Sequence, residues 1–380
     1  MFGSFTKSQR IASLILIGVS ALIALLVLVS VFFISSKKLI ISPTNLGMPY
    51  AELYTEEQLA SKLSEDMIIF NDKLYVGGGD YDKNTGPVYV MSYDLSKRLW
   101  EKSAEPVPDE QIKRFRVIDG SLIITGTDPK ETWEKGNFYR LDRGKWETMR
   151  ELPGGIHCFD AIQFGGKTFF GLGTQSTSYP IVAYDGESYE PVEFYKKGEL
   201  LDLSSNEIIR VFNLFVFKGE LYAFLTLDGK DDLEGINYMD LYHYNGRFFE
   251  FAHGSLPAED MPDVVTTNAF AYFIMNDSLL VTSDLISFSI VGFGEGVTVD
   301  DIIEENGTVY VLVHKKSKLK KFESMIFEVS PFGSQKVLGF LTNIPAGSFC
   351  KHENSFFFSL GTREVHTAAD AGRVIRVKVK

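Results

Sequence analysis

Seven positions that recur at equivalent places in a repeated pattern could bring polar side chains together. These positions are Asp66, Arg114, Asp160, Asn213, Ala271, Asp301 and Ser348, and all but Ala271 are polar. Carboxylates gathered in this way could attract a cation or accept hydrogen bonds from sugar hydroxyls, while Arg114 and the nearby His157 could donate hydrogen bonds. The same side chains would equally suit a water-filled channel mouth that binds nothing. The sequence therefore predicts a polar ring, with a ligand site as its functional interpretation.

Motifs typical of catalysis or metal binding are absent from this sequence. The six histidines form no HExxH pattern, and neither Cys158 nor Cys350 has a CxxC partner. There is no GxSxG motif, no P-loop and no dinucleotide-binding fingerprint after a strand. We therefore assign no catalytic residue, no metal ligand and no cofactor. The competing function is a glycan-active enzyme (hydrolase, lyase or epimerase-like) that uses carboxylates near Asp160 and a base such as His157.

The elements that would position this ring are predicted from an internal repeat of apolar strands and tight polar turns. In the first copy, Asn71-Asp72 turns the chain between two apolar strands. Seven copies occur, and equivalent positions in their second strands are 46 to 58 residues apart, with one interval of 30. These positions are Leu74, Leu122, Thr168, Leu221, Leu279, Val309 and Phe356. The period suits four-stranded blades of a β-propeller, and the short interval predicts a reduced fifth blade near residues 283–296.

The first copy resembles kelch-type β-propellers. Gly77-Gly78 closes its second strand, and Tyr93 is followed seven residues later by Trp100, as in the kelch pattern. Later copies depart from this pattern, because the second has Thr125-Gly126 and the fourth lacks the glycine pair. The resemblance implies an all-β fold with seven blades over residues 62–380. It also implies a binding platform more often than an enzyme that acts on sugars.

The last copy poses a problem of ring closure. It ends at Val374 to Lys380, which reads as a third strand without an outer neighbour. An uncovered strand edge is a liability, so another segment should pair with it. We expect a segment between Leu39 and Tyr54, such as Leu39-Ile40-Ile41, to form the missing strand.

Residues 11–34 form an uncharged run of 24 residues that is rich in Leu, Ile, Val and Ala. As a helix this run would be about 36 Å long, which is enough to cross a bilayer. It is longer than the apolar part of a cleaved signal peptide, and the residues after it make a poor cleavage site. We therefore predict an uncleaved transmembrane signal anchor that contacts the lipid bilayer. A margin of one positive charge favours an extracytoplasmic position for the large domain.

The distribution of charge limits the partners. The chain has a net charge of −12, and residues 39–380 carry 34 bases against 50 acids. Such an acidic body argues against nucleic acid, whose binding needs clustered Lys and Arg. Two charged loops, Asp228–Glu234 and Lys315–Lys321, are predicted on the same face as the polar ring. The lysines could contact anionic lipid or glycan, or could simply keep a hairpin tip soluble.

Asn276 and Asn306 each begin a glycosylation sequon at a predicted hairpin tip. Both sequences are also ordinary turn sequences, and we favour the turn role.

The sequence thus predicts an all-β, single-pass membrane protein in four parts. These are a tail at 1–10, an anchor at 11–34, a linker at 35–61 that can supply the ring-closing strand, and a seven-bladed β-propeller at 62–380. The expected function is that of a binding or assembly module whose loop face contacts a protein or a glycan. A structural subunit of a larger membrane complex is a third possibility.

Overall fold

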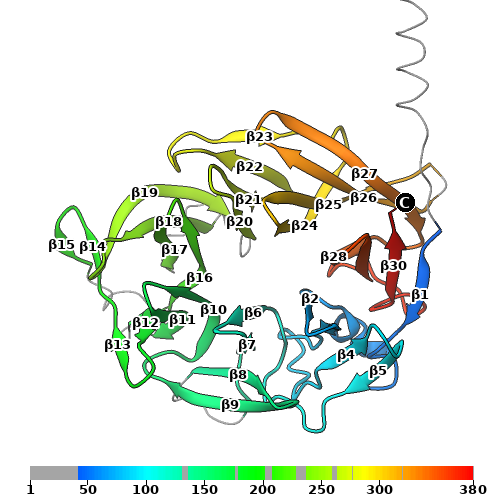
Figure 1. The fold of residues 1–380 in the computed structure, drawn as a ribbon, viewed down its shortest axis with the longest axis horizontal. Helices are drawn as coiled ribbons and strands as arrows, with labels where there is room; N and C mark the ends of the chain where they lie inside the picture. Colours follow the sequence, from blue (N-terminus) through cyan, green and yellow to red (C-terminus); the bar gives the residue numbers. More distant parts are fainter. Residues whose placement is uncertain are drawn as a thin grey trace, which may run out of the picture. The chain divides into compact units, whose positions relative to one another are not determined.

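The computed structural model describes residues 42–130, 136–175, 179–201, 208–227, 237–258, 263–275, 277–318 and 320–379 (Figure 1). Within these ranges the helical segments are two 3-10 turns, η1 (Glu56–Gln58) and η2 (Ala60–Lys62), and the remaining regular structure is β. None of the described helical segments has the length and apolar character that a membrane span requires. The anchor predicted at residues 11–34 lies outside the described residues.

The strands form five four-stranded antiparallel sheets and one larger sheet around a central axis (Figure 1). The first two sheets contain β2 (Met67–Phe70), β3 (Lys73–Val76), β4 (Met91–Asp94) and β5 (Leu99–Lys102), then β6 (Phe115–Ile118), β7 (Ser121–Thr125), β8 (Gly136–Asp142) and β9 (Lys145–Leu152). Two later sheets contain β20 (Val264–Thr266), β21 (Ala271–Met275), β22 (Ser278–Thr282) and β23 (Ser289–Val291), then β24 (Thr298–Glu305), β25 (Thr308–Lys316), β26 (Phe322–Ser330) and β27 (Gly333–Thr342). The fold is therefore all-β and propeller-like, as predicted.

The larger sheet has ten strands and contains two antiparallel runs of four. The first run is β10 (His157–Phe164), β11 (Lys167–Gln175), β12 (Ile181–Tyr184) and β13 (Tyr189–Pro191); the second is β16 (Ile208–Phe217), β17 (Glu220–Leu227), β18 (Asn237–Tyr244) and β19 (Phe249–Ala258). The runs are joined because β11 pairs with β16. The hairpin of β14 (Phe194–Lys196) and β15 (Glu199–Leu200) also connects them, since β14 pairs in parallel with β19.

The closing sheet joins the two ends of the described chain. It contains β28 (Ala346–His352), β29 (Ser355–Leu360), β30 (Val374–Lys378) and β1 (Thr44–Gly47). β1 pairs antiparallel with β30, so a segment between Leu39 and Tyr54 does cover the last strand. This prediction is confirmed, whereas the suggested Leu39-Ile40-Ile41 lies outside the described residues. The indole N–H of Trp100 donates to the Leu46 carbonyl at 2.7 Å and ties β1 to the next sheet.

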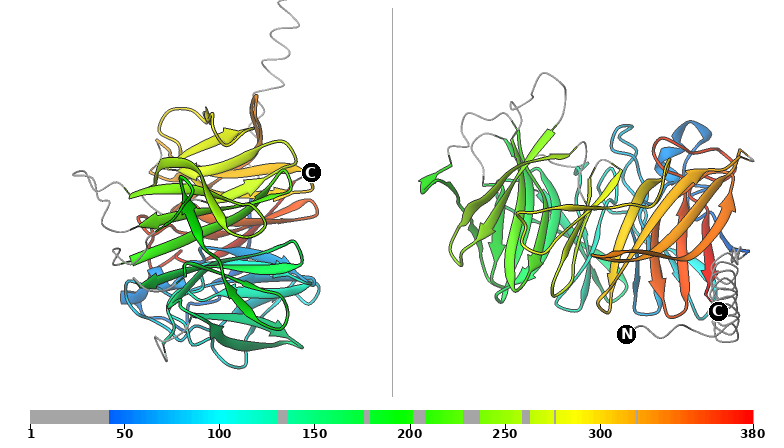
Figure 2. Two further views of the ribbon diagram at one scale, coloured as in Figure 1. Left: turned by 90° about the vertical axis from the view of Figure 1, so that its left-hand side faces the viewer. Right: turned by 90° about the horizontal axis from the view of Figure 1, so that it is seen from above.

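The first strand of each four-stranded run lies nearest the axis. β28 lies against β2 and β24, and β16 lies against β10 and β20. Strands of neighbouring sheets run along the axis between two ends of the ring (Figure 2). We call the end with the turns between first and second strands the hairpin end, and the opposite end the loop end.

Turns at the hairpin end have the backbone conformation that their sequences predict. Asn71 and Asp72 both have positive φ, as do Lys218-Gly219 and Asn306-Gly307. Two consecutive residues with positive φ form the tight turn that suits the twist of a β-hairpin, and Asn, Asp and Gly adopt it at low cost. For Asn306 this supports the turn role of the sequon, whereas Asn276 lies outside the described residues.

The core lies between neighbouring sheets. Consecutive residues of β3 point to opposite faces of their sheet, yet Leu74, Tyr75 and Val76 are all buried, because each sheet packs on both faces. A side chain at Gly77 or Gly78 would collide with Ile112 or Tyr50, so the glycine pair allows the closest approach of neighbouring segments. The Tyr93 and Trp100 rings pack across β4 and β5 with centroids 5.2 Å apart.

The predicted register of the fifth unit is wrong by one strand. The hairpin around Asp277 was expected to join a first and a second strand, but it joins β21 and β22. The first strand is β20, which has only three residues and shows no clear apolar pattern. Ala271 therefore lies on the second strand, and Asp263 directly precedes the innermost one. The unit still has four strands, although both β20 and β23 are short.

Candidate functional site

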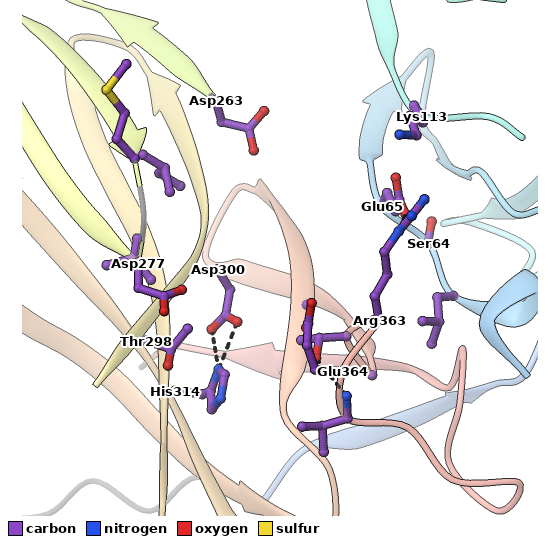
Figure 3. A pocket seen from close by; sticks show the side chains of 18 of the residues that line it. Ser64, Glu65, Lys113, Asp263, Asp277, Thr298, Asp300, His314, Arg363 and Glu364 are labelled. Atoms are coloured by element: carbon purple, nitrogen blue, oxygen red, sulfur yellow. Dashed lines mark hydrogen bonds and ion pairs between the residues drawn. The ribbon is translucent and has the colours of Figure 1, made fainter. Parts of the chain in front are cut away.

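A cavity of about 790 Å³ opens at the loop end of the ring, near the axis (Figure 3). Its walls come from segments before or at the start of the innermost strands, from the end of β21 and the turn after it, from β25, and from the loop between β29 and β30. We call it the central cavity. Its acidic lining residues are Glu65, Asp263, Asp277, Asp300 and Glu364. Because basic groups line it as well, the cavity offers charges of both signs to a polar ligand.

An aspartate–histidine pair lies in one wall of the cavity. The Nδ1 atom of His314 is 2.8 Å from each carboxylate oxygen of Asp300 (Figure 3). A β-bulge between Val299 and Asp301 shifts the register of β24 at this point, next to the pairing of Thr298 with His314. Burial raises the pKa of Asp300 to about 6, against the opposing effect of the His314 hydrogen bond, and the charges of Asp277 and Glu364 act in the same direction as burial.

Arg363 holds the loop between β29 and β30 over the first sheet. Its Nε donates to Glu65 at 2.6 Å, and its two terminal nitrogens donate to Asp82 at 3.2 Å and to Gln111 at 3.1 Å. These partners lie more than 250 residues from Arg363 in the sequence. The fork of guanidinium donors therefore fixes this wall of the cavity.

Arg114 connects three regions of the ring. Its guanidinium donates to the Phe212 carbonyl at 3.0 Å and to Asp263 at 3.2 Å, and lies 3.3 Å from Asp160. The side chain is only 8% exposed. Of the six residues proposed from sequence as ligand-binding, Arg114 is the one found among the described residues that line the central cavity.

The three predicted aspartates form a set of equivalent bonds, two between neighbouring sheets and one, from Asp160, between the two runs of the ten-stranded sheet. The polar ring continues from each aspartate to an equivalent position at the next innermost strand. Each aspartate accepts the backbone N–H of the residue directly after that position. The donors are Phe115 to Asp66 at 2.6 Å, Leu214 to Asp160 at 2.9 Å, and Phe349 to Asp301 at 2.8 Å. Ser348 makes a different bond between sheets, because its hydroxyl donates to the Ser64 carbonyl. We call this set the inter-sheet belt.

The belt aspartates are poorly solvated. Burial raises the pKa of Asp66 to about 6, although Phe115 and two arginines oppose the shift. Burial also raises the pKa of Asp301 well above its ordinary value, with a further contribution from Asp263. Asp160 is fully buried and binds Arg116 through its second oxygen at 2.8 Å. The three carboxylates that were expected to bind a ligand are therefore bonded to backbone N–H groups within the ring.

The remaining two predicted residues lie apart from the cavity lining. The His157 ring stacks on Phe159 at a centroid distance of 5.4 Å, and its Nδ1 contacts the Thr127 carbonyl. Burial lowers the pKa of His157, which favours the neutral ring. Asn213 is buried, and its side-chain oxygen has no hydrogen-bond partner among the described residues.

Sequence reasoning missed Asp263, Asp300, His314 and Glu364. Asp263 was missed through the register error in the fifth unit. Asp300 is the immediate neighbour of the predicted Asp301, and the bulge separates the roles of these two carboxylates. His314 could have been found by folding the sequence about the Asn306-Gly307 turn, which brings it opposite residues 298–300.

Two further features complete the description of the site. The lysine-rich segment Lys315–Lys321 begins with the last two residues of β25 and so lies at the loop end, as predicted. The acidic loop Asp228–Glu234 is outside the described residues. Within the described ranges no group of three or more His, Cys, Asp or Glu side chains could hold a metal ion. Both cysteines are buried and free.

No family model and no curated protein matches this sequence. Similar solved structures include a candidate 6-phosphogluconolactonase from Bacteroides fragilis, with 13% identity over 81% of this chain and 95% of that chain and a TM-score of 0.48. A second, from Bacteroides uniformis, has 13% identity over 76% and 90% and a TM-score of 0.46. A third is BBS1N in complex with ARL6DN, with 11% identity over 90% and 98% and a TM-score of 0.49. Likenesses at this level assign no activity to this chain.

Proposed function

We propose that this chain is a membrane-anchored binding module, in which a β-propeller of seven blades presents the central cavity to the polar part of a protein or a glycan. The blade count follows if the two runs of the ten-stranded sheet are taken as two blades. The anchor is the uncharged run at residues 11–34.

The observation that carries the binding role is the central cavity itself. It is large enough for a small polar ligand or a side-chain cluster of a partner, and charges of both signs reach it from several sheets. Arg114 and Arg363 are already held by carboxylates, so the walls are organised before a ligand arrives. Such preorganisation lowers the ordering cost of binding.

A thermal-shift screen of the full chain in detergent tests this role. The panel contains oligosaccharides, short peptides of either charge and small amines. We expect at least one compound to raise the melting temperature, and Glu364→Gln to abolish that shift. Lys318→Ser, at the exposed hairpin tip of the same end, is the matched control and should keep it. If no compound shifts the melting curve, or if the shift survives in the cavity variant, the cavity is not the binding site.

Membrane anchorage and orientation need a separate test. Protease treatment of intact cells should digest the propeller if the domain is extracytoplasmic, as the one-charge margin at the anchor favours. Permeabilised cells provide the control for accessibility. Protection in intact cells and digestion after permeabilisation would place the domain inside instead.

A glycan-active enzyme is the second candidate, and the Asp300–His314 pair is the observation that favours it. Because Nδ1 of His314 faces the carboxylate, Nε2 is the ring nitrogen available to exchange a proton. In this second candidate function, Asp300 and His314 take the catalytic role that the sequence suggested for Asp160 and His157. The side chains of His157 and Asp160 are engaged in the structural contacts described above. Turnover on a glycan panel that is lost in His314→Gln, with partner binding retained, would favour the enzyme over the binding module.

A further inference from the structure

Large apolar side chains are exposed at the hairpin end of the ring, on one side of it. Eight large hydrophobic residues are exposed among the described residues, and three of them belong to this group. They are Phe332 at 94% exposure, Ile286 at 69% and Leu99 at 58%. We call these three residues the apolar rim.

The strand pairings place the rim at the hairpin end. Phe332 lies in the turn between β26 and β27. Val329, near the end of β26, pairs with Val309, which follows the hairpin at Asn306-Gly307. The turn with Phe332 is therefore at the same end of the ring as that hairpin. Ile286 lies in the corresponding turn between β22 and β23. Leu99 begins β5 opposite Asp94, which pairs with Lys73 beside the Asn71-Asp72 turn. The central cavity is at the other end.

The rim also flanks the point where the chain enters the ring. β20, β24, β28 and β2 follow one another around the axis, so the rim belongs to the sheets on both sides of the closing sheet. In the closing sheet Thr44 pairs with Arg376 in the middle of β30, while Gly47 pairs with Val374 toward the loop end. The chain therefore enters β1 from the side of the hairpin end, in the sheet that lies between the members of the rim.

We propose that the apolar rim contacts the surface of a lipid bilayer. This inference rests on the proposed membrane anchor. Eight residues, 35–42, connect Ile34 at the end of the uncharged run to Pro43, and an extended chain of that length reaches at most about 30 Å. Exposed apolar side chains in the sheets on both sides of the closing sheet would enter the interfacial layer, where a second apolar contact strengthens the membrane binding that the anchor provides.

The location of the rim has a consequence for the central cavity. Since the rim and the cavity lie at opposite ends of the ring, contact of the rim with lipid turns the cavity away from the bilayer. The lysine-rich tip at the loop end is the alternative lipid contact, because five lysines could meet anionic headgroups. The two contacts would require opposite orientations of the domain.

Depth-dependent quenching in vesicles separates these orientations. The full chain is reconstituted in phosphatidylcholine and phosphatidylserine vesicles that contain spin-labelled lipid, with a bimane probe at Phe332→Cys or, as the matched control, at Lys318→Cys. The native cysteines Cys158 and Cys350 are buried, so labelling is directed to the introduced site. Phe332 is almost fully exposed, so its replacement leaves the core intact.

We expect the probe at position 332 to lose most of its emission and to shift to the blue, and the probe at position 318 to remain unchanged. Quenching at 318 without quenching at 332, or at neither site, would overturn the proposed contact while the anchor stands. Release of the chain from the vesicles by alkaline carbonate would overturn the anchor and the rim contact together. The two failures are therefore distinguishable.

Discussion

Replacement of Asp160 by Ala tests whether the inter-sheet belt is structural. Asp160 is fully buried between the runs of the ten-stranded sheet and the second sheet. Its carboxylate accepts the backbone N–H groups of Ala161 and Leu214, each at 2.9 Å, and pairs with Arg116 and Arg114 at 2.8 and 3.3 Å. The substitution leaves all four donors without this acceptor.

The expected loss of stability follows from these contacts. A buried hydrogen-bond donor without an acceptor costs about 1–3 kcal/mol, and removal of one partner of a buried ion pair costs about 3–5 kcal/mol. Arg116 is 35% exposed, so water recovers part of its interaction. We therefore expect Asp160→Ala to lower the free energy of unfolding by about 4 kcal/mol, which is a large share of the total stability of a typical protein. Asp160→Asn retains one acceptor and should cost about half as much.

Urea denaturation of the full chain in detergent, followed by tryptophan fluorescence, measures the effect. Asp185→Ala is the matched control, because Asp185 also accepts two backbone N–H groups, each at 2.8 Å, but at an exposed turn. Water can replace that carboxylate, so the control should lose about 1 kcal/mol or less. If Asp160→Ala is no more destabilising than Asp185→Ala, the belt does not hold the sheets together, and Asp160 returns to consideration as a ligand-binding residue.

Three further predictions concern the ring and its buried acids. Deletion of residues 39–54 removes β1 and should lower the melting temperature of the propeller; an unchanged melting curve would refute its role in closure. Burial raises the pKa of Asp109 to about 6, so the folded chain holds a proton that the unfolded chain releases above about pH 4. The free energy of unfolding should therefore fall as pH rises from about 4 to about 6. Urea denaturation at several pH values, with Asp109→Asn subtracted from wild type, should show this fall in the difference between the two free energies of unfolding. A difference that does not change with pH would contradict the prediction. Gly372→Ala should cost about 2–4 kcal/mol in urea denaturation, because φ is +71° and the added Cβ would lie 1.9 Å from the Lys62 carbonyl oxygen, whereas Gly120→Ala, at a similar φ in open space, should cost about 1 kcal/mol.

The belt changes the interpretation of the polar ring. A residue at the start of each innermost strand lies where two sheets converge, and the backbone N–H of the next strand needs an acceptor there. Asp66, Asp160 and Asp301 provide it. The recurrence that suggested a binding site from sequence is thus equally the signature of a repeated structural bond. Apart from Arg114, the charged residues that line the central cavity, such as Asp300 and Glu364, do not belong to the recurring positions of the ring.

Most of the strands, the turns and the need for ring closure could be predicted from the sequence alone. These features depend on neighbours in the chain, because Asn-Asp and Asn-Gly turns and the apolar runs beside them are local properties. Closure could be predicted as well, since a final strand without a partner is visible in the repeat count. The strands of the fifth unit were misassigned because its first strand has only three residues, too few to show an alternating apolar pattern.

Which polar side chains contact one another could not be predicted from the sequence. A single bulge in β24 sends Asp300 to the cavity with His314 while Asp301 bonds to the next sheet, and no pattern in the sequence marks that bulge. Arg363 bonds to Glu65 across a sequence separation of 298 residues. Contacts of this kind depend on how neighbouring sheets converge on the axis, and that convergence is a property of the closed ring as a whole.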